Sequence, residues 1–473
     1  MSDQSSNRWP KQIKYIIGNE ACERFSYYGM TGILAGYISG QLVHGGLGKT
    51  EDDATSIISL FKSVNYFTPL LGAWLSDKIL GRYKTIFWVS LFYCAGHGTL
   101  ACSDFFGTGG KLNCLFVGLT LIAFGSGGIK PCVSAFMGEQ FRADQSHLMQ
   151  KAYGAFYWAI NFGSFFSFLV VPWVKNHHGY SAAFGVPGIL MAIATFIFWR
   201  GKKLYVIVPT NRELKHNGFF KVIFTTWFQL RQPGKKFWDC ARTHFSEKEV
   251  VAARSVFPIL FVFACIPMFW SLYDQTGSTW VLQGLKMTNA TVLGLDVGGE
   301  QMQSLNALLI LFFVPIFTLF IYPRLGRFAS PLKRMSYGLF LAAAAFVIVA
   351  WLQKRLEAGE HLSVLWQTWP YVVVTAAEVL VSTTGLEFAF REAAPEMKSL
   401  IMSFWLLTTT FGNLFTALLT KVLGHFTPAS AGSASVSSGR FMLFAWMMFG
   451  VAILFSLVAS TYHYRDKAAA QGK

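Results

Sequence analysis

Apolar stretches long enough to cross a lipid bilayer recur along the whole chain, and they restrict its possible folds more than any other feature. Stretches such as LLILFFVPIFTLFIY and FMLFAWMMFGVAILFSLVA approach or reach the roughly 20 residues that a helix needs to span the hydrocarbon core. Inside a bilayer, backbone polar groups must find partners within the protein. Because the chain is 53% hydrophobic and only 14% charged, we predict an all-α membrane protein.

The hydropathy pattern predicts about twelve transmembrane helices in two bundles of six. The expected spans cover residues 13–41, 54–80, 83–101, 112–139, 149–174, 181–199, 253–283, 300–322, 335–356, 362–391, 398–424 and 440–462. A long polar segment divides the first six from the last six, and its patch FFKVIFTTWF is expected to form a short amphipathic helix at the membrane surface. We therefore expect an N-terminal bundle over 1–199, a cytoplasmic linker over 200–252 and a C-terminal bundle over 253–473, as in transporters built from related halves.

The net charge of +16 is explained by topology. With the N-terminus inside, about 29 of the 40 Lys and Arg residues fall on the inner side and about 8 on the outer side, which is the positive-inside pattern. This asymmetry predicts cytoplasmic termini. Because it accounts for the excess positive charge, we expect no nucleic-acid partner. The opening residues MSDQSSNRWPKQIK lack a signal-peptide pattern, so we expect the first span to be retained in a multi-pass protein of the plasma (inner) membrane.

The first predicted span contains more charge than a lipid-facing helix can hold. A charge at the centre of a membrane helix costs about 2.5–3.5 kcal/mol, and the sequence NEACERFSYYGMTG includes three. A rotation of about 100° per residue places its polar side chains on one stripe, which comprises Glu20, Glu23, Arg24, Tyr27 and Thr31. This stripe must face a protein interior or a polar cavity. For the cluster alone, the alternative is a structural ion pair near the inner end of the span.

Other predicted spans repeat this anomaly in both halves of the chain. Isolated charges and amides occur within otherwise apolar segments at Lys130, Asn161, Asp274, Asn306 and Glu378. Charges of both signs spread over both halves indicate one shared polar cavity better than several independent structural pairs.

Several motifs, in order along the chain, resemble those of known transporters. GAWLSDKILGRYKT is similar to the loop motif of the major facilitator superfamily. EACERFSYYG, GGIKPCVSAFMGEQF, FYWAINFGS, FWSLYDQTGSTWVLQ, GLEFAF and SFWLLTTTFGN resemble motifs of the proton-dependent oligopeptide transporter (POT) family. The resemblance covers nearly the whole chain and implies the major facilitator fold, with two six-helix bundles.

The resemblance also implies roles for individual positions. The positions that it links to proton coupling are Glu20, Glu23, Arg24 and Asp274. The positions that it links to peptide binding are Tyr27, Tyr28, Tyr66, Lys130, Tyr157, Asn161, Trp270, Asn306, Glu378, Ser382 and Trp405. Lys130 and Glu378 also match an ion pair that helps to close the inner side, and Asp274 matches an acid of the outer gate.

One departure from the family pattern concerns the outer gate and carboxylate recognition. Where the family reads YYGMR, this chain has Thr31, so Asp274 lacks its usual arginine partner; Ser59 stands where animal members have a histidine. Lys62, four residues before Tyr66 in an otherwise apolar-polar run, is our hypothesis for a partial replacement as the partner of Asp274 and as a gating residue. The alternative is that Lys62 extends to the outer membrane surface.

A peptide's charged ends match the isolated charges of this chain. We expect Lys130 with the Arg24 region to receive a carboxylate, and Glu378 with Asn161 and Asn306 to receive an ammonium group. Because the backbone ends are common to all peptides, aromatic walls could accept varied side chains.

We therefore expect a proton-coupled symporter that imports di- and tripeptides by alternating access. Protons are the coupling ion, with no other cofactor and no metal, and the partners are small peptides and the bilayer around a monomer. The alternatives are a proton-coupled carrier of another small solute (an amino acid, nitrate or a peptide-like drug), and a channel or non-transporting peptide sensor. HExxH, GxSxG and Asp/His clusters are absent from the sequence, so an enzyme is not expected.

Overall fold

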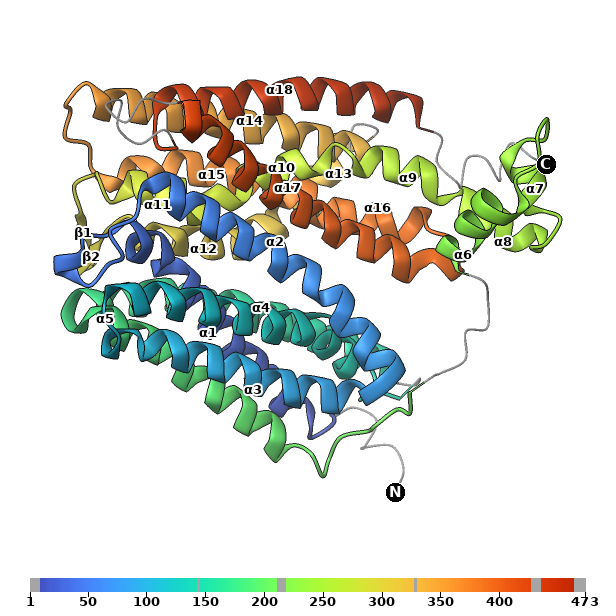
Figure 1. The fold of residues 1–473 in the computed structure, drawn as a ribbon, viewed down its shortest axis with the longest axis horizontal. Helices are drawn as coiled ribbons and strands as arrows, with labels where there is room; N and C mark the ends of the chain where they lie inside the picture. The colour runs from blue at the N-terminus through green and yellow to red at the C-terminus, as the bar shows by residue number, and fades with distance from the viewer. Residues whose placement is uncertain (1–8, 143–144, 211–217, 327–329, 427–434, 463–473) are drawn as a thin grey trace.

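The architecture comes from a computed structural model that describes residues 9–142, 145–210, 218–326, 330–426 and 435–462. Long helices form two bundles that lie side by side (Figure 1). The N-terminal bundle contains α1 (Ile13–Ser39), α2 (Glu51–Leu75), α3 (Arg82–Ala101), α4 (Thr108–Gly138) and α5 (Ser146–Arg200). The C-terminal bundle contains α9 (Val256–Phe263), α10 (Ile266–Tyr273), α11 (Thr279–Gly284), α12 (Ser304–Ile316), α13 (Tyr322–Leu325), α14 (Pro331–Glu357), α15 (Thr368–Glu378), α16 (Thr384–Glu392), α17 (Lys398–Phe426) and α18 (Ser438–Thr461).

The helices are long and apolar enough for a protein that crosses a membrane repeatedly. Within the described residues, seven helices meet this criterion, and the bent pair Glu247–Phe263 and Ile266–Gly284 would make an eighth span. α5 covers two of the predicted spans. Its backbone leaves the helical conformation between them, at Gly179, with φ 80° and ψ 178°. α1, α2 and α3 occupy the first three predicted spans but do not meet this criterion of length and apolarity. The prediction of an all-α chain with membrane-crossing helices is confirmed.

The two bundles are joined at the left-hand end of Figure 1. α2 packs against α17, and α5 packs against α12. Lys175 Nζ lies 2.5 Å from Glu300 Oε2, which is 2% exposed, and Lys286 Nζ lies 2.8 Å from Glu51 Oε1. Paired charges therefore help to hold this end closed.

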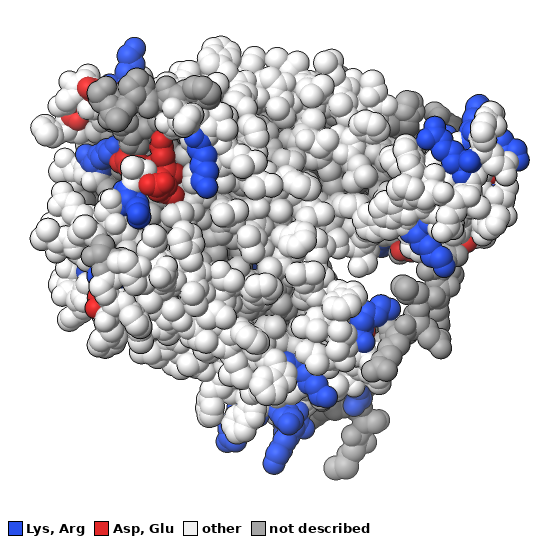
Figure 2. Space-filling model, in the orientation of Figure 1, with Lys and Arg blue, Asp and Glu red and all other residues white. Residues whose placement is uncertain are grey.

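The opposite end is hollowed between the bundles. Figure 2 shows this hollow, with Lys and Arg side chains on its border. Beside it lie α6 (Phe219–Thr225), α7 (Phe237–Ala241) and α8 (Glu247–Arg254) from the segment between the bundles. α6 and the turn after it bury one face and expose large aromatic side chains on the other, namely Phe220, Phe224, Trp227 and Phe228.

A short hairpin, which the sequence reading did not anticipate, lies at the closed end. β1 (Ala290–Val292) pairs antiparallel with β2 (Leu295–Val297). Leu293 and Gly294 connect them with φ values of 52° and 81°, which suits the tight turn of a two-residue hairpin loop.

Candidate functional site

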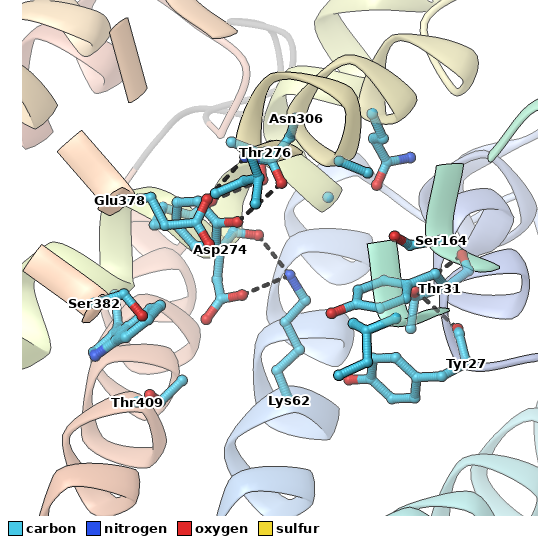
Figure 3. A pocket seen from close by; sticks show the side chains of 18 of the residues that line it. Tyr27, Thr31, Lys62, Ser164, Asp274, Thr276, Asn306, Glu378, Ser382 and Thr409 are labelled. Carbon is cyan, nitrogen blue, oxygen red and sulfur yellow. Dashed lines mark hydrogen bonds and ion pairs between the residues drawn. The ribbon is translucent and has the colours of Figure 1, made fainter. Parts of the chain in front are cut away.

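A cavity of about 370 Å³ lies between the two bundles (Figure 3). α1, α2 and α5 form one wall, and α10, α12, α15 and α17 form the other. All predicted peptide-binding residues except Lys130 line this cavity: Tyr27, Tyr28, Tyr66, Tyr157, Asn161, Trp270, Asn306, Glu378, Ser382 and Trp405. The structure therefore brings together side chains that lie up to several hundred residues apart in the sequence.

The charged lining consists of one cation and two acids among the described residues, namely Lys62, Asp274 and Glu378. Lys62 Nζ lies 3.0 Å from Asp274 Oδ1 and donates a second hydrogen bond to the Asp274 backbone carbonyl at 2.8 Å. Asn413 Nδ2 donates to the other carboxylate oxygen, Oδ2, at 2.6 Å. The contact predicted between Lys62 and Asp274 is present, and it joins the two bundles.

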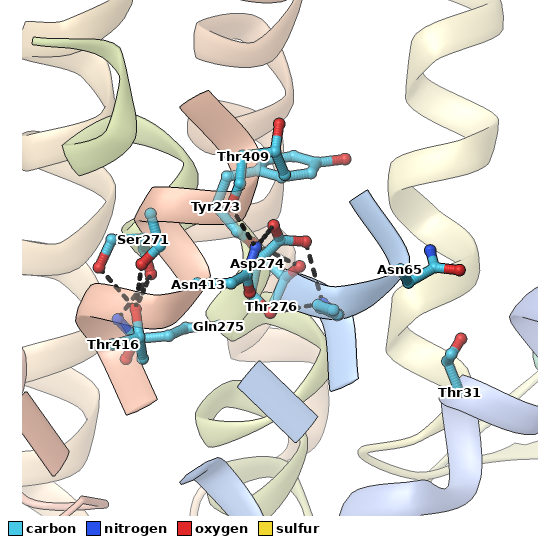
Figure 4. Close-up of polar contacts among 12 residues, drawn as sticks. Thr31, Asn65, Ser271, Tyr273, Asp274, Gln275, Thr276, Thr409, Asn413 and Thr416 are labelled. Carbon is cyan, nitrogen blue, oxygen red and sulfur yellow. Dashed lines mark hydrogen bonds and ion pairs between the residues drawn. The ribbon is translucent and has the colours of Figure 1, made fainter. Parts of the chain in front are cut away.

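Hydrogen bonds between α10 and α17 hold Asp274 in position (Figure 4). The hydroxyls of Ser271 and Thr416 lie 2.6 Å apart, and Gln275 Nε2 donates to the Ser271 carbonyl at 2.9 Å. α10 ends at Tyr273 and continues as the 3-10 turn Asp274–Gly277. The carboxylate is thus held at the point where the helix tightens, facing α2.

The second acid, Glu378, belongs to a network confined to the C-terminal bundle. Asn306 Nδ2 donates to Glu378 Oε2 at 2.9 Å and to Thr375 Oγ1 at 3.0 Å, which engages both amide hydrogens. Tyr273 OH donates to Asn306 Oδ1 at 3.3 Å. α15 passes at Glu378 into a π turn over Val379–Thr383, a local widening that is frequent at functional sites.

The charge cluster of the first span is buried outside the cavity lining. Arg24 Nε lies 3.2 Å from Glu20 Oε1, and the guanidinium also contacts Glu23. The three side chains are at most 7% exposed. The Arg24 guanidinium carbon lies 5.8 Å from the centre of the Tyr27 ring, which does line the cavity. The polar stripe therefore begins at the cavity wall and continues into the interior of the N-terminal bundle.

Lys130 is partly exposed but is not among the described residues that line this cavity. Its Nζ lies 4.8 Å from the centre of the Tyr27 ring and 4.3 Å from that of Tyr66, so cation–π contacts compensate its charge. No ion pair between Lys130 and Glu378 occurs in the conformation seen here, within the part of the chain that the structure describes. This separation agrees with the hollow between the bundles, because the resemblance assigns that pair to a closed inner side.

Several lining residues were missed by the sequence reading. They are Ile160, Ser164, Phe168, Tyr273, Thr276, Gly277, Gln303, Ala307, Ile310, Tyr371, Leu386, Leu406 and Thr409. Most lie three or four positions from a predicted lining residue, so helical spacing alone would have found those.

The described residues contain no group of three or more His, Cys, Asp or Glu side chains that could hold a metal ion.

Comparison with known proteins identifies the family. The sequence model of the POT family matches residues 83–436. The chain belongs to the POT family. This is a family of membrane transporters and not of enzymes.

Individual POT family relatives agree with this assignment. Solute carrier family 15 member 2 of Rattus norvegicus is 36% identical over 375 residues, which are 75% of this chain and 50% of the relative. Peptide transporter family 1 of Drosophila melanogaster is 39% identical over 369 residues, which are 75% of this chain and 49% of the relative. The chain thus spans about half the length of these curated relatives.

Two crystal structures of POT family proteins match along nearly their whole length. A structure of an auto-inhibited POT family peptide transporter has a TM-score of 0.86 and 37% identity, and the match covers 96% of this chain and 98% of the other. The structure of the POT family transporter PepTSo has a TM-score of 0.86 and 34% identity. That match covers 96% of this chain and 99% of the other. The predicted two-bundle major facilitator fold is confirmed.

Replacing one member of the Lys62–Asp274 pair should destabilise the protein more than replacing both. Asp274→Asn leaves an ammonium that is only 12% exposed without its carboxylate, and removing one partner of a buried pair costs about 3–5 kcal/mol. Lys62→Met/Asp274→Asn removes both charges and should recover most of that loss. The measurement is thermal unfolding of the detergent-purified single and double variants.

The exposed pair Arg242–Glu247 provides the control, because its side chains are 39% and 62% exposed. The same double-variant comparison at this pair should give a coupling below about 1 kcal/mol. Additive losses at Lys62 and Asp274 would contradict an energetically coupled pair.

Proposed function

We propose that this POT family member is a proton-coupled symporter that imports di- and tripeptides by alternating access. The observation that carries the proposal is the charge distribution in the cavity, where one cation, Lys62, and two acids, Asp274 and Glu378, lie among aromatic walls. A dipeptide zwitterion needs a cation for its carboxylate and an acid for its ammonium group. The aromatic walls provide contact area without demanding a particular side chain. The names of the relatives, which include a peptide transporter and a POT family peptide transporter, support peptides as the substrate class.

The amino terminus of the peptide is assigned to the acid of the C-terminal bundle. Glu378 accepts a hydrogen bond from Asn306, and an ammonium group can join this network by donating to the carboxylate and to amide oxygens. Asn161 reaches the cavity from α5, where its Nδ2 donates to the Tyr157 carbonyl at 3.0 Å. The Asn161 side-chain oxygen is thus available as a further acceptor.

Proton coupling is assigned to the buried cluster of Glu20, Glu23 and Arg24. Two carboxylates share one guanidinium, so a change in the partner of Arg24 alters how strongly each acid holds a proton. If peptide binding favours protonation, protonation must favour peptide binding to the same extent. The membrane potential adds about 2.3 kcal/mol per charge per 100 mV and drives protons inward.

The two ends of the molecule support alternating access. One end is closed by contacts between the bundles, and the other is hollow. We assign Lys130 and Glu378 to the closing of the hollow end in the alternate state. The three-part division at 199 and 252, cytoplasmic termini, a plasma (inner) membrane location and a monomeric state remain part of the proposal.

Uptake of labelled dialanine into proteoliposomes tests the function. An inward proton gradient should drive accumulation, and unlabelled di- and tripeptides should compete. Failure of unlabelled dipeptides to compete would overturn the peptide assignment, and competition by nitrate or single amino acids alone would favour another solute. A sensor would show no exchange of labelled for unlabelled dialanine across the membrane, whereas a carrier would.

Glu378→Gln should weaken binding of dialanine by about tenfold or more, because a hydrogen bond to a charged group contributes about 1.5–3 kcal/mol. N-acetyl-dialanine lacks the ammonium group, so its affinity should change little. The control is Glu387→Gln, nine positions further on, where the carboxylate is 48% exposed and pairs with Arg334. Equal losses for both ligands would contradict the assignment of Glu378 to the amino terminus.

A further inference from the structure

We infer that Lys62 is the residue that receives the substrate's carboxylate, and that it does so by exchanging Asp274 for the substrate. This inference rests on the proposed transport of peptides and specifies how one end of the substrate is recognised. It replaces the expectation that Lys130 and the Arg24 region provide the cation.

The first argument is access to the cavity. Lys62 is the one cation among the described residues that line it. The Lys130 ammonium lies against the rings of Tyr27 and Tyr66, and Arg24 is paired with two glutamates behind the wall. A substrate in the cavity therefore meets the Lys62 ammonium, whereas the Lys130 ammonium lies over two tyrosine rings and outside the described lining.

The second argument is the residue at position 31. The motif resemblance leads us to expect an arginine there, and this chain has Thr31. The Thr31 hydroxyl donates to the carbonyls of Tyr27 and Tyr28, at 3.1 and 3.2 Å, within its own helix. Thr31 thus contributes no charge to the cavity. In Figure 3 the Lys62 side chain rises between Thr31 and Asp274, so it supplies a cation from α2 in the space beside this position.

The third argument is the fit of the ammonium beside the 3-10 turn after α10. A Cβ atom added to Gly277 would lie 3.2 Å from Lys62 Nζ, so the absence of a side chain there allows the close approach. An ammonium has three hydrogen-bond donors, and Asp274 accepts two of them, one at its carbonyl and one at Oδ1. Lys62 and Asp274 both line the cavity, so a substrate there can reach the pair although its side chains are only 12% and 11% exposed.

The fourth argument is the energetic balance of the exchange. When Lys62 turns to a substrate carboxylate, one anionic partner replaces another, and the ammonium is never left buried alone. Asp274 gives up its cation in this exchange and keeps one donor, the Asn413 amide at 2.6 Å. The exchange removes an ion pair that joins the two bundles. Substrate binding at Lys62 therefore loosens one of their contacts.

The test compares dialanine with dialanine amide, which has the ammonium group but no carboxylate. Equilibrium binding is measured with the purified full chain. The unsubstituted protein should bind dialanine about tenfold or more tightly than the amide, because the carboxylate adds charge-assisted hydrogen bonds. Lys62→Met should reduce this preference to nearly one, mainly by weakening dialanine binding. Lys62→Arg, which keeps the charge, should retain most of the preference.

Further variants separate recognition from a structural effect. Lys62→Met/Asp274→Asn leaves no unpaired charge and should show the same loss of preference. Arg242→Met, at the exposed pair with Glu247, should leave it unchanged. Loss of the preference in Lys130→Met together with its retention in Lys62→Met would overturn the inference while leaving peptide transport intact. Absence of dialanine binding to the unsubstituted chain would overturn the proposed function and this inference together.

Discussion

A charge buried away from water costs several kcal/mol unless another group compensates it, and this constraint organises the space between the two bundles. Arg24 is held by two glutamates, Lys62 by Asp274, and Lys130 by tyrosine rings. Each cation thus has a compensating group close by in the observed state. Any rearrangement of the bundles must exchange these partners, because simply losing one would leave a charge uncompensated. A substrate with charged ends, or a proton, is a suitable exchange partner.

The closed and hollow ends follow from where the pairs lie. Lys175–Glu300 and Lys62–Asp274 both connect the N-terminal bundle to the C-terminal bundle. Opening the closed end must separate these pairs, and each then needs water or another charge in place of its partner. The acid Glu378 differs, since its hydrogen bonds remain within the C-terminal bundle. Glu378 can therefore bind an ammonium group, or Lys130, without a change in the contacts at the closed end.

Much of the fold and of the cavity wall could be predicted from the sequence, because apolar spans and polar residues within them leave few alternatives in a membrane. The contact between Lys62 and Asp274 was also anticipated, since a missing arginine left an acid without a cation. The packing of Lys130 over two tyrosine rings, outside the cavity lining, was not anticipated, because helical periodicity gives the face of a side chain but not what packs against it. The hairpin over 290–297 was missed because its strands are three residues long and carry no clear alternation. Which end of the molecule is closed and which is hollow depends on tertiary packing, and local sequence patterns do not determine it.

The central claim is that peptide and proton move together through this cavity, and substrate-driven proton movement tests it most directly. Proteoliposomes that enclose a pH-sensitive dye are prepared with no pH gradient and with the membrane potential clamped to zero, and dialanine is then added outside. The account predicts that the lumen acidifies as dialanine enters, although no proton gradient was imposed, and that protein-free liposomes show no such change. Entry of dialanine without acidification would contradict the account.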